Sequence, residues 1–177
     1  MKYNVLINGS EHILDIRKPI ANDFDAYVAF IKQIATETNF TYHYPNEPEP
    51  NRENQIHLWE SKYRHTMAVF DGDNMVGYFC LYVTNPKHPY LGHNGGHHTY
   101  ILQKYTGNGL GSFFLKDLDI IARNLGIKRI SINVHADNGI NLRILQKHGF
   151  TIESIAKRRY FVNNKYIDAV NLVKWID

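Results

Sequence analysis

The chain has 177 residues, of which 44% are hydrophobic and 21% charged, and its formal net charge at pH 7 is +3. A chain of this length buries about two-thirds of its unfolded surface, so we expect a single domain over residues 1–177 that needs no metal or disulfide to fold. The composition excludes a disordered chain, the single cysteine excludes an internal disulfide, and no apolar run approaches the roughly 18 residues of a membrane span.

Charge and terminal sequence also limit the partners. The basic residues are scattered apart from the short cluster at 157–159, so we expect no nucleic-acid binding. The first ten residues lack a continuous apolar segment and a cleavage pattern, so we expect no secretory signal, no membrane partner and a cytoplasmic location. Cys80 lies in an apolar run and is expected to be buried and inert. Composition leaves the oligomeric state open, a homodimer included.

The N-terminal part of the chain predicts a hairpin followed by a helix. Two extended segments at 5–7 and 12–17 are separated by the turn-forming sequence Asn8-Gly9-Ser10. Asn22 or Asp23 can then cap a helix whose apolar residues recur at helical spacing and which should end near 36–39. The segment 44–50 contains three prolines and predicts a loop, and a shorter helix is expected at about 52–63.

The middle of the chain predicts β-structure. Extended segments at 66–70 and 75–83 flank Asp71-Gly72-Asp73-Asn74, the strongest hairpin signal in the sequence. A stretch rich in glycine and histidine at 85–98 is expected to be a loop that leads to a strand at about 99–103. From there strands alternate with helices, which predicts parallel pairing with right-handed crossovers in this half and hence a mixed sheet.

The loop Thr106-Gly107-Asn108-Gly109-Leu110-Gly111 joins the strand to a helix that should run to Gly126. Three glycines at alternate positions permit a tight turn and the close approach of a ligand, and the helix start offers free N–H groups and a positive dipole end. This arrangement predicts an anion site suited to a pyrophosphate. The loop lacks the Lys-Ser or Lys-Thr of a P-loop and the glycine spacing of a dinucleotide fingerprint. A plain strand-to-helix turn remains an alternative.

The C-terminal part adds a strand and a helix. Residues 129–135 alternate apolar and polar side chains, which is typical of a strand with one buried face. Asp137 or Asn138 can cap the next helix, at about 139–147, and Gly149 is placed for a left-handed helix end before Phe150.

These segments resemble the acetyl-CoA-binding region of the GNAT superfamily of N-acetyltransferases. The loop at 106–111 matches the family's Gly-x-Gly-x-Gly but has Thr106 where the family has Arg or Gln. The segment 138–150 is similar to the family's Asn-x-x-Ala…Lys-x-Gly-Phe, and Tyr166-Ile167-Asp168 to its late Tyr-x-Asp strand. The resemblance, which covers Ile101 to the C-terminus, implies an α/β (α+β) fold: a mixed, centrally splayed β-sheet flanked by helices, the GNAT-like acyl-CoA N-acyltransferase fold.

The resemblance also implies the co-substrate and the residues that bind it. Acetyl-CoA would lie on the glycine loop, its pantetheine arm would pair with the backbone of the preceding strand, and the N–H of Ile101 or Leu102 would face the thioester oxygen. Asn138 would contact the arm from the other side, or serve only as a helix cap. No metal is implied. The cofactor-binding residues expected are Ile101, Leu102, Gln103, Thr106, Gly107, Asn108, Gly109, Leu110, Gly111, Ser112 and Asn138.

The catalytic residues are less well specified. Many family members carry a tyrosine that protonates the departing thiolate, but here that position is Leu145, which cannot donate a proton. Tyr100, Tyr160 or Tyr166 could serve instead, as could water, or the thiolate could leave unassisted. For the base that accepts the amine's proton, Glu37 and His135 are candidates. Glu37 could also be only a solvated helix-end acid, and His135 only a packed strand-end histidine.

The resemblance implies an N-acetyltransferase that transfers an acetyl group from acetyl-CoA to a primary amine of a small molecule or peptide, by direct attack in a ternary complex. The alternative, motivated by Leu145, is a catalytically silent CoA-binding or interaction module on the same fold. The histidines of the 85–98 stretch could bind zinc, but no cysteine or carboxylate completes a ligand spacing, so a flexible loop is preferred. These histidines are His88, His93, His97 and His98.

Overall fold

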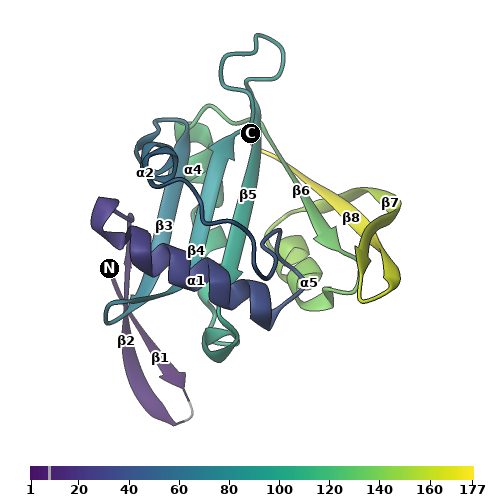
Figure 1. Ribbon diagram of the computed structural model, residues 1–177. Coiled ribbons are helices and arrows are strands. Elements are labelled where there is room, and N and C mark those ends of the chain that lie inside the picture. Colours follow the sequence, from purple (N-terminus) through teal and green to yellow (C-terminus); the bar gives the residue numbers. More distant parts are fainter. Residues whose placement is uncertain (8) are drawn as a thin grey trace. The chain divides into compact units, whose positions relative to one another are not determined.

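The computed structural model describes residues 1–7 and 9–177, so Asn8 of the expected first turn lies outside the described residues. The chain divides into two compact units, the first made of residues 1–81 and 98–111 and the second of residues 82–97 and 112–177. Strand neighbours follow the order β1-β2-β3-β4-β5-β6-β8-β7 (Figure 1). The predicted class, a mixed sheet flanked by helices, is therefore confirmed. The expectation of a single domain stays a prediction.

Eight strands, five α-helices and two 3-10 turns occur in the described part of the chain. In chain order they are β1 (Lys2–Ile7), β2 (Ser10–Arg17), η1 (Ala21–Asp23), α1 (Phe24–Glu37), α2 (Arg52–Glu60), β3 (Arg64–Asp71), β4 (Asn74–Val83), β5 (Asn94–Ile101), η2 (Gln103–Tyr105), α3 (Leu110–Lys116), α4 (Leu118–Asn124), β6 (Arg129–His135), α5 (Gly139–Lys147), β7 (Thr151–Val162) and β8 (Lys165–Trp175).

In the first unit, the N-terminal hairpin is confirmed, and its second strand also pairs with β3. Helix α1 crosses the face of β3 and β4 (Figure 1), and its buried side is the apolar stripe that the sequence predicted. Asp23 precedes α1, but its carboxylate does not bond to the first turn of the helix. It accepts hydrogen bonds from the two terminal nitrogens of Arg17 and from the N–H of Ile20, each at 2.7 Å. Asp23 therefore ties β2 to the start of the helix. The Arg17 guanidinium holds the pKa of Asp23 below its usual value.

The second helix, α2, ends at Glu60, earlier than the expected 63. Its first turn is capped by Asn51, whose side chain accepts a hydrogen bond from the N–H of Asn54 at 2.9 Å. Trp59 anchors the helix because it is 1% exposed and meets the ring of Tyr27 edge-on, with ring centroids 5.5 Å apart. The proline-rich segment before α2 is a loop, as predicted.

In the second unit, most strand pairs are antiparallel. Strand β6 pairs along its whole length with β8, and β8 pairs with β7. Among the pairs given for the described strands of this unit, the parallel one joins β5 and β6, at Asn94 with Arg129 and Gly95 with Ile130. The expectation of parallel pairing throughout this half is therefore wrong beyond these two strands, because β7 and β8 form a hairpin whose second strand returns beside β6.

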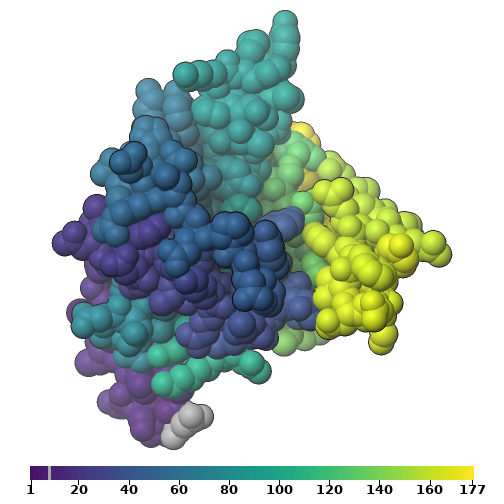
Figure 2. Space-filling view, in the orientation of Figure 1, coloured from purple at the N-terminus to yellow at the C-terminus, as the bar shows by residue number. Residues whose placement is uncertain are grey.

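The expected loop at 85–98 is too long, because β5 already begins at Asn94. A Cβ atom on Gly95 would lie 2.6 Å from Cδ1 of Ile127, and one on Gly96 would lie 2.8 Å from Oη of Tyr82. Glycine is therefore needed at these two positions because neighbouring side chains pack closely against the strand backbone, and the two glycines do not mark a turn. The true loop, 84–93, projects as a separate arm in Figure 2. The helix expected after the glycine loop is also interrupted, at Asp117.

Candidate active site

The glycine loop is a turn held by its own hydrogen bonds. Gly107 and Gly109 have φ angles of 80° and 81°, a left-handed conformation that favours glycine. The N–H and Oγ1 of Thr106 donate to the carbonyl of Gln103 at 3.1 and 2.8 Å, and the side chain of Asn108 donates to the Thr106 carbonyl at 3.3 Å. The loop is therefore shaped before any ligand binds.

The N–H groups of the glycine loop have no hydrogen-bond acceptor within the described part of the chain. Within residues 1–7 and 9–177, no protein acceptor is recorded for the N–H groups of residues 107–111. No atom lies within 4 Å of the position that a Cβ on Gly107 would occupy, and the nearest to Gly109 is Oη of Tyr3 at 3.1 Å. Several donors without a protein acceptor, at the start of a helix and beside open space at Gly107, are the chemistry that binds phosphate oxygens.

Two tyrosines support the glycine loop through hydrogen bonds of their hydroxyl groups. The hydroxyl of Tyr3 donates to the carbonyl of Asn108 at 2.9 Å. Tyr105 is buried, and its hydroxyl donates to Asp71 at 2.8 Å, where Nδ1 of His12 also lies 2.8 Å away. Burial and the Asp71 carboxylate raise the pKa of Tyr105 to about 12. Burial opposes ionisation of Asp71, but the bonds from Tyr105 and His12 hold its pKa below the usual value. Sequence reasoning missed this support because it links distant segments.

The end of β5 and the residues that follow it, up to the start of η2, direct their N–H groups differently. The N–H of Leu102 donates to the carbonyl of Val76 at 3.0 Å, and that of Gln103 donates to Glu37 at 2.7 Å. Because successive N–H groups of an extended segment point to opposite sides, the N–H of Ile101 is directed away from β4. Of the two donors expected to face the thioester, Ile101 is thus the one not engaged by β4.

Glu37 lies at the end of α1, as predicted. Its Oε2 accepts the N–H of Gln103 at 2.7 Å, and its Oε1 accepts the side chain of Gln33 at 2.8 Å. Both carboxylate oxygens are therefore hydrogen-bonded, and Glu37 ties α1 to the segment that precedes the glycine loop.

The first unit contains a pocket of about 240 Å³. Side chains from α1, the loop after it, α2 and strands β3 to β5 line this pocket, which contains no carboxylate. The lining residues are Tyr27, Ile31, Tyr42, His43, Gln55, Arg64, Tyr78, His98 and Tyr100. Of the three catalytic candidates, Tyr100 is the one found here.

The charges in the pocket follow from burial. Burial, together with the nearby charges of Arg64 and His43, lowers the pKa of His98 to about 4, so this histidine is neutral at pH 7. Burial raises the pKa of Tyr27 to about 12 and that of Tyr78 further. Both phenols therefore keep their protons, and Arg64 supplies a permanent positive charge.

His43 of the pocket forms a pair that was not anticipated, with Glu47, which is not among the lining residues. Nδ1 of His43 is hydrogen-bonded to Oε1 of Glu47, and the side chains are only 23% and 19% exposed. The ring of His43 meets that of Tyr100 edge-on, with centroids 5.8 Å apart. The four-residue spacing of this pair was visible in the sequence, but nothing there predicted a turn that would join its members.

The second unit holds the other predicted site residues. His135, at the end of β6, is 8% exposed and stacks on Tyr160 with ring centroids 3.8 Å apart. Burial lowers its pKa, although Asp137 opposes this effect. The side chain of Asn138 accepts the N–H of Asn141 at 3.2 Å, so its expected role as cap of α5 is confirmed.

The residues discussed as a proton source occupy different environments. Leu145, which replaces the family's tyrosine, is 1% exposed and belongs to the core of the second unit. Tyr166 is 64% exposed. Ser112, an expected cofactor contact, lies in the first turn of α3.

The described residues contain no group of three or more histidine, cysteine, aspartate or glutamate side chains that could hold a metal ion. His97 instead packs against the ring of Phe150 at 5.8 Å. None of the helices described is long and apolar enough to cross a membrane.

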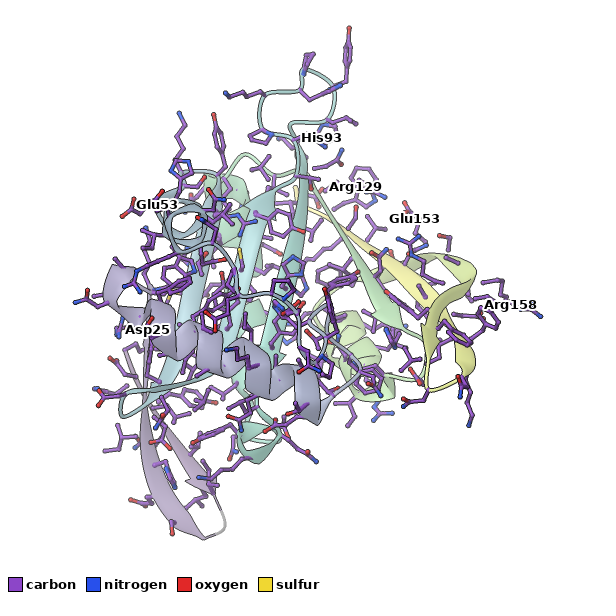
Figure 3. All side chains as sticks on the ribbon, in the orientation of Figure 1. Asp25, Glu53, His93, Arg129, Glu153 and Arg158 are labelled. Carbon is purple, nitrogen blue, oxygen red and sulfur yellow. The ribbon has the colours of Figure 1, made fainter. Side chains whose placement is uncertain are left out.

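Basic residues of the second unit have local partners. The guanidinium of Arg129 points toward Glu153 in Figure 3 and donates to both its oxygens, at 2.6 and 2.8 Å. The cluster at 157–159 lies in a bulged part of β7, where Lys157 bonds to Asp168 at 2.8 Å. The side chain of Arg158 points outward in Figure 3.

The family is established by comparison with known sequences. The family model described as an acetyltransferase (GNAT) domain matches residues 16–171, which run through both units. The chain therefore belongs to the GNAT acetyltransferase family and is an acyltransferase, as the combined resemblance of the glycine loop and the 138–150 segment implied.

Individual relatives agree with this assignment. Over 166 residues the chain is 24% identical to the L-amino acid N-acetyltransferase AaaT of Escherichia coli K12, covering 90% of this chain and 96% of that protein. A GNAT-family acetyltransferase from Streptococcus pneumoniae has 26% identity and a TM-score of 0.83, covering 93% of this chain and 99% of that one. The yncA protein of Salmonella typhimurium, solved with its cofactor acetyl-CoA, has 17% identity and a TM-score of 0.77, covering 93% and 94%.

Proposed function

We propose that this protein transfers an acetyl group from acetyl-CoA to the primary amine of a small molecule, by direct attack in a ternary complex. One observation carries the proposal: a single segment of the first unit supplies both binding regions. Tyr100 lines the pocket, Ile101 follows it with an N–H directed away from β4, and the donor-rich glycine loop comes next. A segment of this kind can hold two substrates with their reacting groups adjacent.

The residues present fit the diphosphate of coenzyme A. The N–H groups of residues 107–111 would hold its oxygens, and the open space at Gly107 leaves room for them. Thr106, in place of the family's longer side chain, leaves these backbone donors unchanged. Asn138 stays a proposed contact to the pantetheine arm. When bound, acetyl-CoA supplies an activated acetyl thioester that an amine can attack.

Residues at the junction of the two regions would assist the reaction. The N–H of Ile101 would donate to the thioester oxygen, where negative charge develops. Tyr100 carries a phenolic proton and is the proposed donor to the departing sulfur. His135 is a poor candidate for the base, because its ring is stacked on Tyr160 and burial lowers its pKa.

The pocket favours a small acceptor that carries a carboxylate. Its volume of about 240 Å³ is below the usual range for drug-sized ligands, about 300–1,000 Å³. Arg64 offers a positive charge suited to a carboxylate, and the tyrosines offer apolar surface. A relative named L-amino acid N-acetyltransferase is consistent with this chemistry. We therefore propose an L-amino acid, or a close analogue, as acceptor.

The test measures free CoA with a thiol reagent, after calorimetry has demonstrated acetyl-CoA binding. The acceptors are the L-amino acids and matched amines that lack the carboxylate, such as phenylalanine against phenethylamine. We expect release of CoA with amino acids and at least a tenfold lower kcat/KM with the matched amines. Tight binding of acetyl-CoA without turnover of any amine would contradict the proposal and favour the silent module. Equal rates with both acceptors of each pair would contradict the proposed recognition of a carboxylate.

A further inference from the structure

Backbone hydrogen bonds and a turn fix the positions of His43 and Glu47 in the loop between α1 and α2. The N–H of Glu47 donates to the carbonyl of Tyr44 at 3.2 Å, and Asn46 adopts a φ of 66°, so a turn brings the two side chains together. The N–H of His43 also donates to Oγ1 of Thr41 at 3.1 Å. The backbone on both sides of the pair is therefore held in place.

The burial of this pair differs from that of a surface ion pair between α1 and the same loop. The side chains of Lys32 and Glu49, which also form an ion pair, are each 57% exposed. Those of His43 and Glu47 are 23% and 19% exposed. Partial burial strengthens a charge-assisted bond, whereas exposed pairs of the first kind contribute little.

The bond determines which nitrogen of His43 carries the proton. An ionised carboxylate only accepts hydrogen bonds, so Nδ1 of His43 must donate to Glu47. In the neutral ring, Nε2 then has no proton and is a proton acceptor. Orientation of a histidine by a carboxylate through Nδ1 is a common way to prepare Nε2 as a base.

His43 is also in the right place. It lines the acceptor pocket beside Tyr100, the residue directly before the proposed thioester contact Ile101. The other candidates in the first unit are less suited. His98, on the same strand as Tyr100, has its pKa lowered to about 4 and is a weak base, and Glu37 is hydrogen-bonded through both oxygens.

We propose that His43, oriented by Glu47, is the general base of the acetyl transfer. The acceptor enters as an ammonium ion, one of its protons passes to Nε2 of His43, and the free amine that remains attacks the thioester carbonyl. The C–S bond then breaks, Tyr100 protonates the departing sulfur, and the second proton lost by the attacking nitrogen returns to Tyr100 through water. The imidazolium is stabilised by Glu47 and returns its proton to water. This inference rests on the proposed function, because it assumes that the pocket holds the acceptor.

The kinetic test uses the full chain and the amino acid that gives the fastest CoA release. His43→Gln should lower kcat by about 100- to 1,000-fold, the usual contribution of general-base catalysis, with KM for acetyl-CoA unchanged. Its rate should also rise with pH up to the pKa of the acceptor amine, because only free amine would react. Glu47→Gln should lower kcat by about tenfold, because it removes the group that orients the base. The matched controls His57→Gln and Glu49→Gln, both exposed, should stay within twofold of the wild type.

A second readout does not depend on turnover. Nitrogen-15 NMR of the imidazole should show His43 with its proton on Nδ1 in the wild type and a mixture of tautomers in Glu47→Gln. A wild-type His43 protonated on Nε2 would overturn the inference, as would an unchanged rate and pH profile in His43→Gln. In either case amino acid turnover by the wild type would leave the proposed function standing. If the wild type turns over no amine, the proposed function fails and the inference fails with it.

Discussion

Two pairs of glycines, close together in the sequence, act in opposite ways. Gly95 and Gly96 lie in β5, where neighbouring side chains come so close that a Cβ would meet them at 2.6 and 2.8 Å. Gly107 and Gly109 lie in the glycine loop, where φ is 80° and 81°. The first pair is required by lack of space and the second by backbone conformation. A glycine-rich stretch is therefore not by itself evidence for a turn or for a ligand site.

The largest effect that separates the two pairs should come from Gly109→Glu. The new carboxylate would stand among the N–H groups proposed to hold the diphosphate, and repulsion between like charges should lower acetyl-CoA affinity by at least about 100-fold. Isothermal titration calorimetry measures this loss. Gly72→Ala is a suitable control because Gly72 also has positive φ, at 60°, but lies in the β3–β4 hairpin. Unchanged affinity in Gly109→Glu would remove the cofactor from this loop.

Gly95→Ala should destabilise the fold by about 1–3 kcal/mol, the usual cost of overpacking. Its methyl group would meet Ile127, which is 1% exposed and cannot move into solvent. Chemical denaturation of the single variant and of Gly95→Ala with Ile127→Val measures the effect. Shortening Ile127 should restore part of the loss. A stable single variant would mean that β5 and Ile127 are not in close contact.

His98, between the two glycine pairs, should make stability depend on pH. Its folded-state pKa of about 4 lies below the ordinary 6.5, so the unfolded chain binds the proton more readily. Stability should fall as pH decreases from about 6.5 toward about 4, by at most about 1.4 kcal/mol per pH unit. Denaturation curves between these limits should show a shallower dependence in His98→Gln. An equal slope in both proteins would contradict this assignment.

The smallest effect is expected for Gly107→Ala. Open space surrounds this position, so the cost is that of a left-handed alanine alone, about 1 kcal/mol in unfolding free energy. Gly107→Asn should cost less, because Asn46, Asn163 and Asn164 of this chain already adopt positive φ. Thermal denaturation of both variants compares them. A loss in Gly107→Ala as large as that in Gly95→Ala would erase the distinction between the two glycine pairs.

Local signals account for the parts of the fold that the sequence predicted. The stripe of α1, the turn at Asp71–Asn74 and the left-handed Gly149, with φ of 86°, each depend on neighbouring residues. The place of Gly95 and Gly96 in β5 could not be predicted in this way, because their close neighbours, Ile127 and Tyr82, are distant in sequence. The same holds for the antiparallel return of β8 beside β6, which depends on partners distant in sequence.

The candidate site divides along the same line. The glycine loop was recognisable because its residues are consecutive. The pocket was not, since it collects side chains from two helices, three strands and a loop, and Arg64 and His43 carry no motif of their own. Glu37 was singled out for its position at a helix end, but its bond to Gln103 could not be foreseen.

The hydroxyl of Tyr3 donates a hydrogen bond to the carbonyl of Asn108, so the outermost strand of the first unit also supports the glycine loop that we propose binds the cofactor. The match to the family begins only at residue 16. A gene fragment cut at that boundary would discard β1 and with it this prop. The shortened protein should bind acetyl-CoA more weakly, so its affinity would underestimate that of the 177-residue chain.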